Sequence, residues 1–144
     1  MQALLATDGV TDLGVSFGVG EGRTPSFARK VMGRVGVVHV KSPADTSSPD
    51  SVRVAQRLAE LTGSLVADDL VSDTAIVMTG GDTARSVLDR LGVQVLEVRR
   101  SLAPGVVLSK ADLGGRSVCM VTKAGGFGET DLFVRIVRQL LEKH

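Results

Sequence analysis

The sequence contains few of the residues that mark several common classes of protein. Among its 144 residues there is no Trp, no Tyr and only four Phe, so aromatic residues make up 3% of the chain. Sites that stack nucleic-acid bases use aromatic faces, and so do sites that stack sugars. The scarcity of aromatic residues therefore argues against a binder of single-stranded nucleic acid and against a lectin.

Cysteine, net charge and long apolar runs are scarce as well. The single cysteine, Cys119, cannot form an internal disulfide, which fits a reducing compartment. Seventeen Lys and Arg against sixteen Asp and Glu leave a net charge of +1, too little to steer the protein to nucleic acid or to an acidic membrane. No apolar run reaches the roughly 18 residues of a membrane span, and the N-terminus has no signal-peptide pattern. We therefore expect a cytoplasmic protein that binds neither nucleic acid nor a membrane.

Hydrophobic residues and glycine are the abundant types. Hydrophobic residues make up 43% of the chain and charged residues 23%, a composition that excludes intrinsic disorder. At roughly 150 residues per domain the length predicts a single domain, residues 1–144. The 17 glycines are clustered rather than periodic. Clustered glycines mark tight turns where the backbone approaches another group closely.

Short apolar runs alternate with segments of helical periodicity along the chain. The predicted strands are Val35–Val40, Thr74–Thr79, Val93–Val98 and Arg116–Thr122, with a short extended piece at Gly105–Leu108. The predicted helices are Asp50–Leu65, Thr83–Leu91 followed by Gly92 as a left-handed cap, and Thr130–Glu142 with Thr130 as its N-cap. A further strand at Val15–Val19 and a helix at Pro25–Met32 are weaker predictions, because glycines interrupt the pattern there. The alternation predicts an α/β fold: a mostly parallel sheet flanked by helices in a Rossmann-like three-layer domain.

The sharpest motif directly follows the predicted strand Thr74–Thr79. Gly80 and Gly81 come first, and Asp82 and Thr83 then open a predicted helix. The unpaired N–H groups at a helix N-terminus and the positive end of the helix dipole favour an anion. In α/β sheets such turns lie at the carboxyl ends of strands, where ligands bind. The motif alone leaves open the alternative that Asp82 or Thr83 only caps the helix and the glycines only form the turn.

A second glycine turn follows the predicted strand Arg116–Thr122. Lys123 comes first and is followed by Gly125, Gly126 and Gly128. An ammonium group supplies charge to a phosphate, and glycines supply exposed N–H groups; the alternative is a loop with a solvated lysine. Because the carboxyl ends of parallel strands meet at one edge of a sheet, we predict that the two glycine turns face one pocket.

Other candidate sites are weaker. The chain has no G-x-x-x-x-G-K-[ST] motif, and the glycines of residues 18–22 alternate instead of following the G-x-G-x-x-G spacing. This argues against a P-loop protein and against a Rossmann oxidoreductase. His39 and His144 have no second ligand nearby, so no metal site made of protein residues is predicted. Cys119 lies in an apolar run and is interpreted as a small buried hydrophobic residue. No carboxylate pair and no Ser-His-Asp set stands out, so no catalytic residue is assigned.

Taken in order, these turns and their flanking segments resemble the C-terminal nucleotide-binding domain of the four-carbon acid sugar kinases, which act on threonate, erythronate and 3-oxo-tetronate. The segments that carry the resemblance are Val77–Ala84, Leu91–Val93, Pro104–Val106 and Thr122–Gly128, and it covers residues 50–144. The resemblance implies that the chain binds ATP with Mg²⁺. The nucleotide-binding residues that it implies are Gly80, Gly81, Asp82, Thr83, Lys123, Gly125, Gly126 and Gly128.

The sequence also departs from the family. We expect no part of these 144 residues to form the N-terminal sugar-acid-binding domain, which carries the acidic catalytic residues of the family, and the serine-rich turn that usually opens the nucleotide domain is not recognisable. Val107 stands where the family often has proline. The resemblance therefore implies the ATP-binding part of a kinase that needs a sugar-acid-binding domain or subunit and is inactive alone. The alternative is a stand-alone nucleotide- or anion-binding regulatory module. Whether the chain forms a homo-oligomer stays open.

Overall fold

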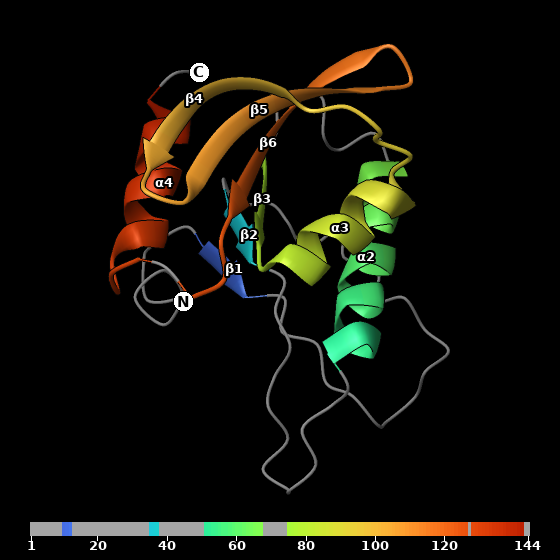
Figure 1. Cartoon of the computed structure of the whole chain (residues 1–144), viewed down its shortest axis with the longest axis horizontal. Coiled ribbons are helices and arrows are strands. Elements are labelled where there is room, and N and C mark those ends of the chain that lie inside the picture. Colours follow the sequence, from blue (N-terminus) through green and yellow to red (C-terminus); the bar gives the residue numbers. More distant parts are fainter. Residues whose placement is uncertain (1–9, 13–34, 38–50, 68–74, 127, 143–144) are drawn as a thin grey trace, which may run out of the picture. The chain divides into compact units, whose positions relative to one another are not determined.

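The computed structural model describes residues 10–12, 35–37, 51–67, 75–126 and 128–142 (Figure 1). The chain divides into two compact units, Ala55–Glu129 and a second one made of Met1–Val54 with Thr130–His144. The strand and helix predicted at 15–19 and 25–32 lie outside the described residues. Among the helices that are described, none is long and apolar enough to cross a membrane.

The unit Ala55–Glu129 is built on a sheet whose described strands have the order β3-β6-β5-β4. These strands are β3 (Ala75–Thr79), β6 (Arg116–Lys123), β5 (Val106–Leu113) and β4 (Glu97–Ala103). β3 and β6 run parallel, with Ala75 opposite Cys119. β5 runs antiparallel to both β6 and β4. The α/β class is thus confirmed, whereas the predicted mostly parallel sheet is wrong, because only one of these three pairings is parallel.

Two tight hairpins explain the antiparallel pairings. Pro104 and Gly105 join β4 to β5, and Gly114 and Gly115 join β5 to β6. Gly105, Gly114 and Gly115 have φ values of 71°, 63° and 87°, in the left-handed region that two-residue hairpin turns use. The Gly115 amide also donates a 2.7 Å hydrogen bond to Oδ1 of Asp112. A two-residue connection can join only antiparallel strands, whereas a parallel pair needs a long crossover.

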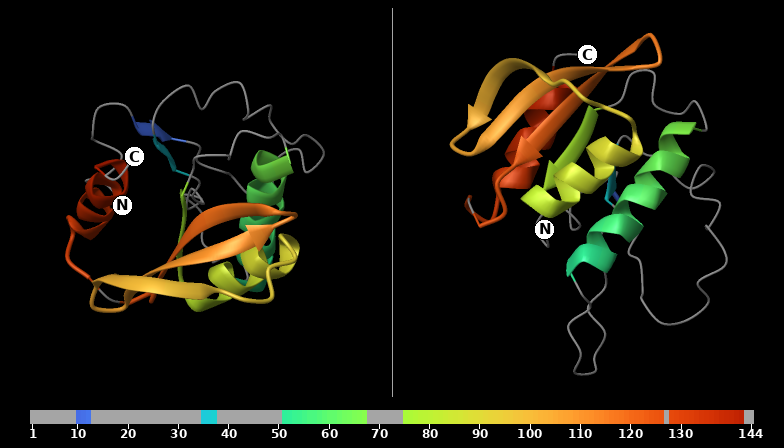
Figure 2. Two further views of the ribbon diagram at one scale, coloured as in Figure 1. Left: turned by 90° about the horizontal axis from the view of Figure 1, so that it is seen from above. Right: turned by 45° about the vertical axis from the view of Figure 1, so that its right-hand side comes forward.

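Helices α2 (Ser51–Ala67, from Ala55 onward in this unit) and α3 (Gly81–Arg90) pack on one face of the sheet (Figure 2). Side chains from both helices and from β3, β5 and β6 meet in one hydrophobic core. The buried residues of this core are Ala59, Val66, Met78, Val87, Ala111, Leu113, Val118 and Met120. The helical spacing seen in the sequence therefore does place the apolar residues of α2 and α3 toward the sheet.

The smaller unit contains strands β1 (Val10–Asp12) and β2 (Val35–Val37) and helix α4 (Leu132–Leu141). β1 and β2 are parallel, and β1 was not predicted. α4 buries Leu132 and Ile136, one turn apart. Asp131 occupies the N-cap position without a side-chain hydrogen bond, so the prediction of Thr130 as the N-cap is wrong.

The remaining predicted elements are confirmed with shifted bounds. α3 begins at Gly81, two residues before the predicted start, and Gly92 after it has φ 69°, which confirms the left-handed cap. The strand predicted at Val93–Val98 is wrong over residues 93–96, because β4 begins only at Glu97. The amide of Val93 donates to the carbonyl of Leu88 at 2.9 Å, which ties residue 93 to the end of α3.

The β5–β6 hairpin supports a first prediction. Gly115→Val should lower the free energy of unfolding by about 1–2 kcal/mol, because a side chain is unfavourable in the left-handed region. A Cβ built on Gly115 meets no atom within 4 Å, so the loss should come from the backbone and not from a clash. Gly126→Val is the matched control, since Gly126 is equally open and has no positive φ. If urea unfolding finds both variants equally stable, the left-handed backbone of Gly115 is not the cause of the expected loss.

Candidate functional site

The two glycine turns follow the ends of neighbouring parallel strands. Thr79, the last residue of β3, lies opposite Lys123, the last residue of β6. The Gly80 amide donates to the Lys123 carbonyl at 3.0 Å, and a Cβ built on Gly125 would lie 3.8 Å from Cα of Gly80. The structure therefore brings the two predicted turns side by side at one end of the sheet.

The first turn of α3 leaves backbone amides open. Gly80 is the N-cap, with φ 90° and ψ 137°, and its carbonyl accepts a 3.0 Å hydrogen bond from the Ala84 amide. No side chain caps this helix, so neither Asp82 nor Thr83 has the capping role that the alternative interpretation gave them. Within the described part of the chain, the amides of Gly81, Asp82 and Thr83 have no hydrogen-bond acceptor, as at other helix N-termini. These donors and the helix dipole favour an anion.

Lys123 is buried at the end of β6. Only 7% of the residue is exposed, so the alternative of a solvated lysine is wrong, and so is the placement of Lys123 outside the strand. Its Nζ donates to the carbonyl of Ala124 at 2.9 Å and to that of Gly125 at 3.1 Å. The ammonium charge therefore lies inside the second glycine turn.

Gly126 and Gly128 continue this turn on the exposed surface. A Cβ built on Gly126 meets no atom within 4 Å. Gly128 has φ 107°, a conformation that side-chain-bearing residues rarely adopt. At Gly126 and Gly128 the turn thus offers backbone rather than side chains to an approaching ligand.

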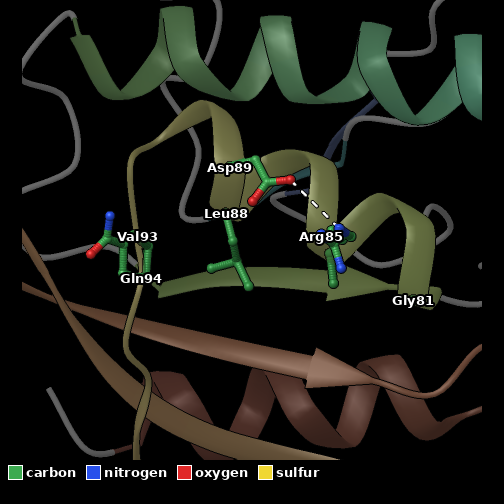
Figure 3. A pocket seen from close by; sticks show the side chains of 7 residues that line it. Gly81, Arg85, Leu88, Asp89, Val93 and Gln94 are labelled. Carbon is green, nitrogen blue, oxygen red and sulfur yellow. Dashed lines mark ion pairs between the residues drawn. The ribbon is translucent and has the colours of Figure 1, made fainter.

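An open groove of about 680 Å³ runs along α3, beginning at Gly81 (Figure 3). The groove is lined by Gly81, Ala84, Arg85, Leu88, Asp89, Val93 and Gln94. Its wall combines apolar Leu88 and Val93 with the ion pair of Arg85 Nε and Asp89 Oδ2, which are 3.7 Å apart. The groove was not predicted from the sequence, because its residues form no local motif. They lie on one face of α3, and the only sequence signal for this is the helical spacing of residues 81, 84, 85, 88 and 89.

Together these features describe an α/β unit in which the open amides at the start of α3 lie beside the second glycine turn, an arrangement that favours an anion. The sequence comparison agrees with this class. The chain belongs to the family described as nucleotide-binding C-terminal domain, whose model matches residues 31–133. The family resemblance inferred from the motifs is thereby confirmed.

The curated relatives are kinases of four-carbon acids. The chain is 34% identical to the 3-oxo-tetronate kinase of Cupriavidus necator in an alignment of length 106 that covers 66% of this chain and 24% of that enzyme. It is 31% identical to the 3-oxo-tetronate kinase of Pseudomonas fluorescens in an alignment of length 126 that covers 80% of this chain and 28% of that enzyme. It is 38% identical to the D-threonate kinase of Bordetella bronchiseptica in an alignment of length 97 that covers 65% of this chain and 23% of that enzyme. The chain therefore spans about a quarter of the length of the curated relatives it matches.

Solved structures share the fold. One is a Bordetella bronchiseptica protein described as a domain of unknown function with bound citrate and as a domain-swapped dimer. It matches with a TM-score of 0.74 and 26% identity, over 96% of this chain and 35% of that one. A putative tRNA synthase from Salmonella typhimurium matches with a TM-score of 0.64 and 20% identity, over 92% and 35% of the two chains, and supports the fold alone.

Proposed function

We propose that this chain is the ATP-binding part of a four-carbon acid sugar kinase. Together with a sugar-acid-binding domain or subunit it would phosphorylate a sugar acid such as threonate, erythronate or 3-oxo-tetronate. The observation that carries the proposal is the parallel pairing of β3 with β6, which sets the open amides of α3 beside the second glycine turn. Membership of the nucleotide-binding family and the kinase relatives support it.

In this proposal the phosphates of ATP bind at the end of the sheet. The amides of Gly81, Asp82 and Thr83 donate to phosphate oxygens, and Gly80 allows the close approach. The second turn, with Gly125, Gly126, Gly128 and the charge of Lys123, faces the same phosphates. Each charge-assisted hydrogen bond contributes about 1.5–3 kcal/mol.

Mg²⁺ would reach the site together with the nucleotide. No group of three His, Cys, Asp or Glu among the described residues could hold a metal ion by itself. Mg²⁺ is commonly held by one or two carboxylates together with substrate phosphates. Asp82, exposed in the first turn of α3, offers such a carboxylate, so the residues present fit a phosphate-bound Mg²⁺.

The groove along α3 is a suitable place for the nucleoside. From Gly81 to Leu88 the helix rises by about 10 Å, the scale on which a nucleotide extends from its phosphates to its base. Leu88 and Val93 offer apolar contacts to a base, and the Gln94 amide offers both a donor and an acceptor. The Asp89 carboxylate can accept a hydrogen bond from a ribose hydroxyl.

The chemistry would be divided between two parts of the enzyme. Phosphoryl transfer depends mainly on positioning and on electrostatic stabilisation of the phosphates. This chain would hold and orient ATP, while the sugar-acid-binding part would supply the acceptor hydroxyl and the catalytic base. We therefore assign no catalytic residue within this chain. If the chain is instead a regulatory module, it would bind nucleotide but would not support phosphoryl transfer with any sugar-acid-binding domain or subunit.

Titration calorimetry of the full chain tests this proposal. We expect MgATP and MgADP to bind with micromolar-to-millimolar dissociation constants, about −4 to −8 kcal/mol. Inorganic triphosphate should bind more weakly than ATP, because it leaves the α3 groove empty. No binding at millimolar MgATP would contradict the proposal. Phosphorylation of threonate by the chain alone would contradict the division of labour, and failure of added sugar-acid-binding domain to restore turnover would favour the regulatory module.

A further inference from the structure

We propose that Lys123 is a positioning residue that aims the amides of Gly125 and Gly126 at the anion site, instead of contacting the phosphates itself. The inference takes the identity of the anion from the proposed function. The orientation of the turn follows from the geometry of this chain alone.

The ammonium group of Lys123 is held within the second glycine turn. Lys123 is 7% exposed, and a buried ammonium requires hydrogen-bond acceptors. Its Nζ donates to two consecutive carbonyls, those of Ala124 at 2.9 Å and Gly125 at 3.1 Å. The Ala124 amide is fixed in turn by a 3.0 Å hydrogen bond to the Gly105 carbonyl. The start of the second glycine turn is therefore tied both to the β4–β5 hairpin and to the lysine.

The hydrogen bonds of Lys123 fix the direction of the Gly125 and Gly126 amides. In a planar trans peptide the C=O and N–H groups point in opposite directions, and the described chain has no cis peptide bond. The Ala124 carbonyl shares a peptide unit with the Gly125 amide, and the Gly125 carbonyl shares one with the Gly126 amide. Because both carbonyls point toward Nζ, both amides point away from it.

The amides of Gly125 and Gly126 are open to a ligand. In the described part of the chain neither the Gly125 nor the Gly126 amide has a hydrogen-bond acceptor, and both residues are exposed. Gly125 lies beside Gly80, next to the open amides of α3. Successive N–H groups that converge on one place form an anion-binding surface. The lysine thus supplies the second turn with its orientation and with a positive charge behind it.

The test compares Lys123→Met with Lys110→Met. Methionine keeps an apolar stem but has no ammonium, and Lys110 is a partly buried lysine on β5, away from the turn. In the ligand-free full chain, Lys123→Met should lower the ¹⁵N order parameters of Gly125 and Gly126 from about 0.85 to below 0.6. Its affinity for MgATP should fall at least about tenfold. Lys110→Met should change neither quantity. Unchanged order parameters in Lys123→Met, with or without a loss of affinity, would overturn the inference.

An NMR titration of the wild type tests the same role of Lys123 without a variant, and it is decisive if Lys123→Met does not fold. During titration with MgATP, the amide signals of Gly125 and Gly126 should shift, while the ¹⁵Nζ signal of Lys123 stays in place. A large shift of the ¹⁵Nζ signal with unchanged Gly125 and Gly126 amides would show direct contact and overturn the inference. If the wild type binds no MgATP, the proposed function fails, whereas the ligand-free order parameters still decide the role of the lysine.

Discussion

Gly81→Val should remove most of the nucleotide affinity of the chain while leaving its melting temperature close to that of the wild type. Gly81 is the first residue of α3, it is exposed, and a Cβ built there meets no atom within 4 Å. It has no positive φ, so valine fits the backbone without strain. The added side chain would occupy the space through which a phosphate approaches the α3 amides. Loss of two charge-assisted hydrogen bonds costs about 3 kcal/mol or more, which is over a hundredfold in affinity.

The matched control for Gly81→Val is Gly115→Val. The hairpin variant should lose stability and keep its affinity for MgATP, whereas the helix variant should lose affinity and keep its stability. Calorimetric titration and thermal unfolding of both proteins give the four numbers needed. If Gly81→Val binds MgATP as tightly as the wild type, the phosphates do not bind at the amides of α3.

Met120→Ala should cause the largest loss of stability. Met120 is fully buried in the middle of β6, between Ile76 of β3 and Ser109 of β5. Truncating a buried methionine to alanine costs about 2–5 kcal/mol, which is a large part of the roughly 5–15 kcal/mol that holds a domain folded. Urea unfolding should show a lower midpoint with an unchanged slope.

The control for Met120→Ala is Val98→Ala on β4. Val98 is 68% exposed, and substitutions at such surface positions usually change stability by less than about 0.5 kcal/mol. Equal midpoints for the two variants would contradict the assignment of Met120 to the core of this unit.

Local patterns in the sequence predicted the part of the fold that builds the site. β3 and β6 are nearly continuous apolar runs, as expected of strands covered on both faces, and each is followed by glycines. Their parallel orientation was expected, and the structure shows in addition that the two strands pair directly. The two turns therefore lie side by side because each follows an apolar parallel strand, a pattern that is visible in each segment of the sequence separately.

The antiparallel half of the sheet was not predicted because its strands lack a simple apolar run. Lys110 and Asp112 interrupt β5, although alternate residues Ala111 and Leu113 are buried. Such alternation is typical of an antiparallel strand. Gly114 and Gly115 between two strands are a recognised signal of a two-residue hairpin, and this signal identifies β5 and β6 as one hairpin.

The burial of Lys123 depends on strand pairing, which cannot be predicted from the residues around it in the sequence. A lysine before three glycines is typical of an exposed loop, but the register of β6 places it opposite Val106 and Thr79. Thr79 belongs to β3, a strand distant in sequence, and Val106 lies at the far end of the β5–β6 hairpin. The burial of Lys123 and its hydrogen bonds to the turn could therefore not be predicted from the sequence.

An amide NMR titration of the full chain with MgATP would show whether the two glycine turns form one nucleotide site. We expect one common dissociation constant for the shifts of the amide signals of Gly80, Gly81, Asp82, Thr83, Gly125, Gly126 and Gly128. The amide signals of Gly114 and Gly115 in the β5–β6 hairpin should not move. Shifts confined to one of the two glycine turns, or separate dissociation constants for the two, would contradict a single nucleotide site at the ends of β3 and β6.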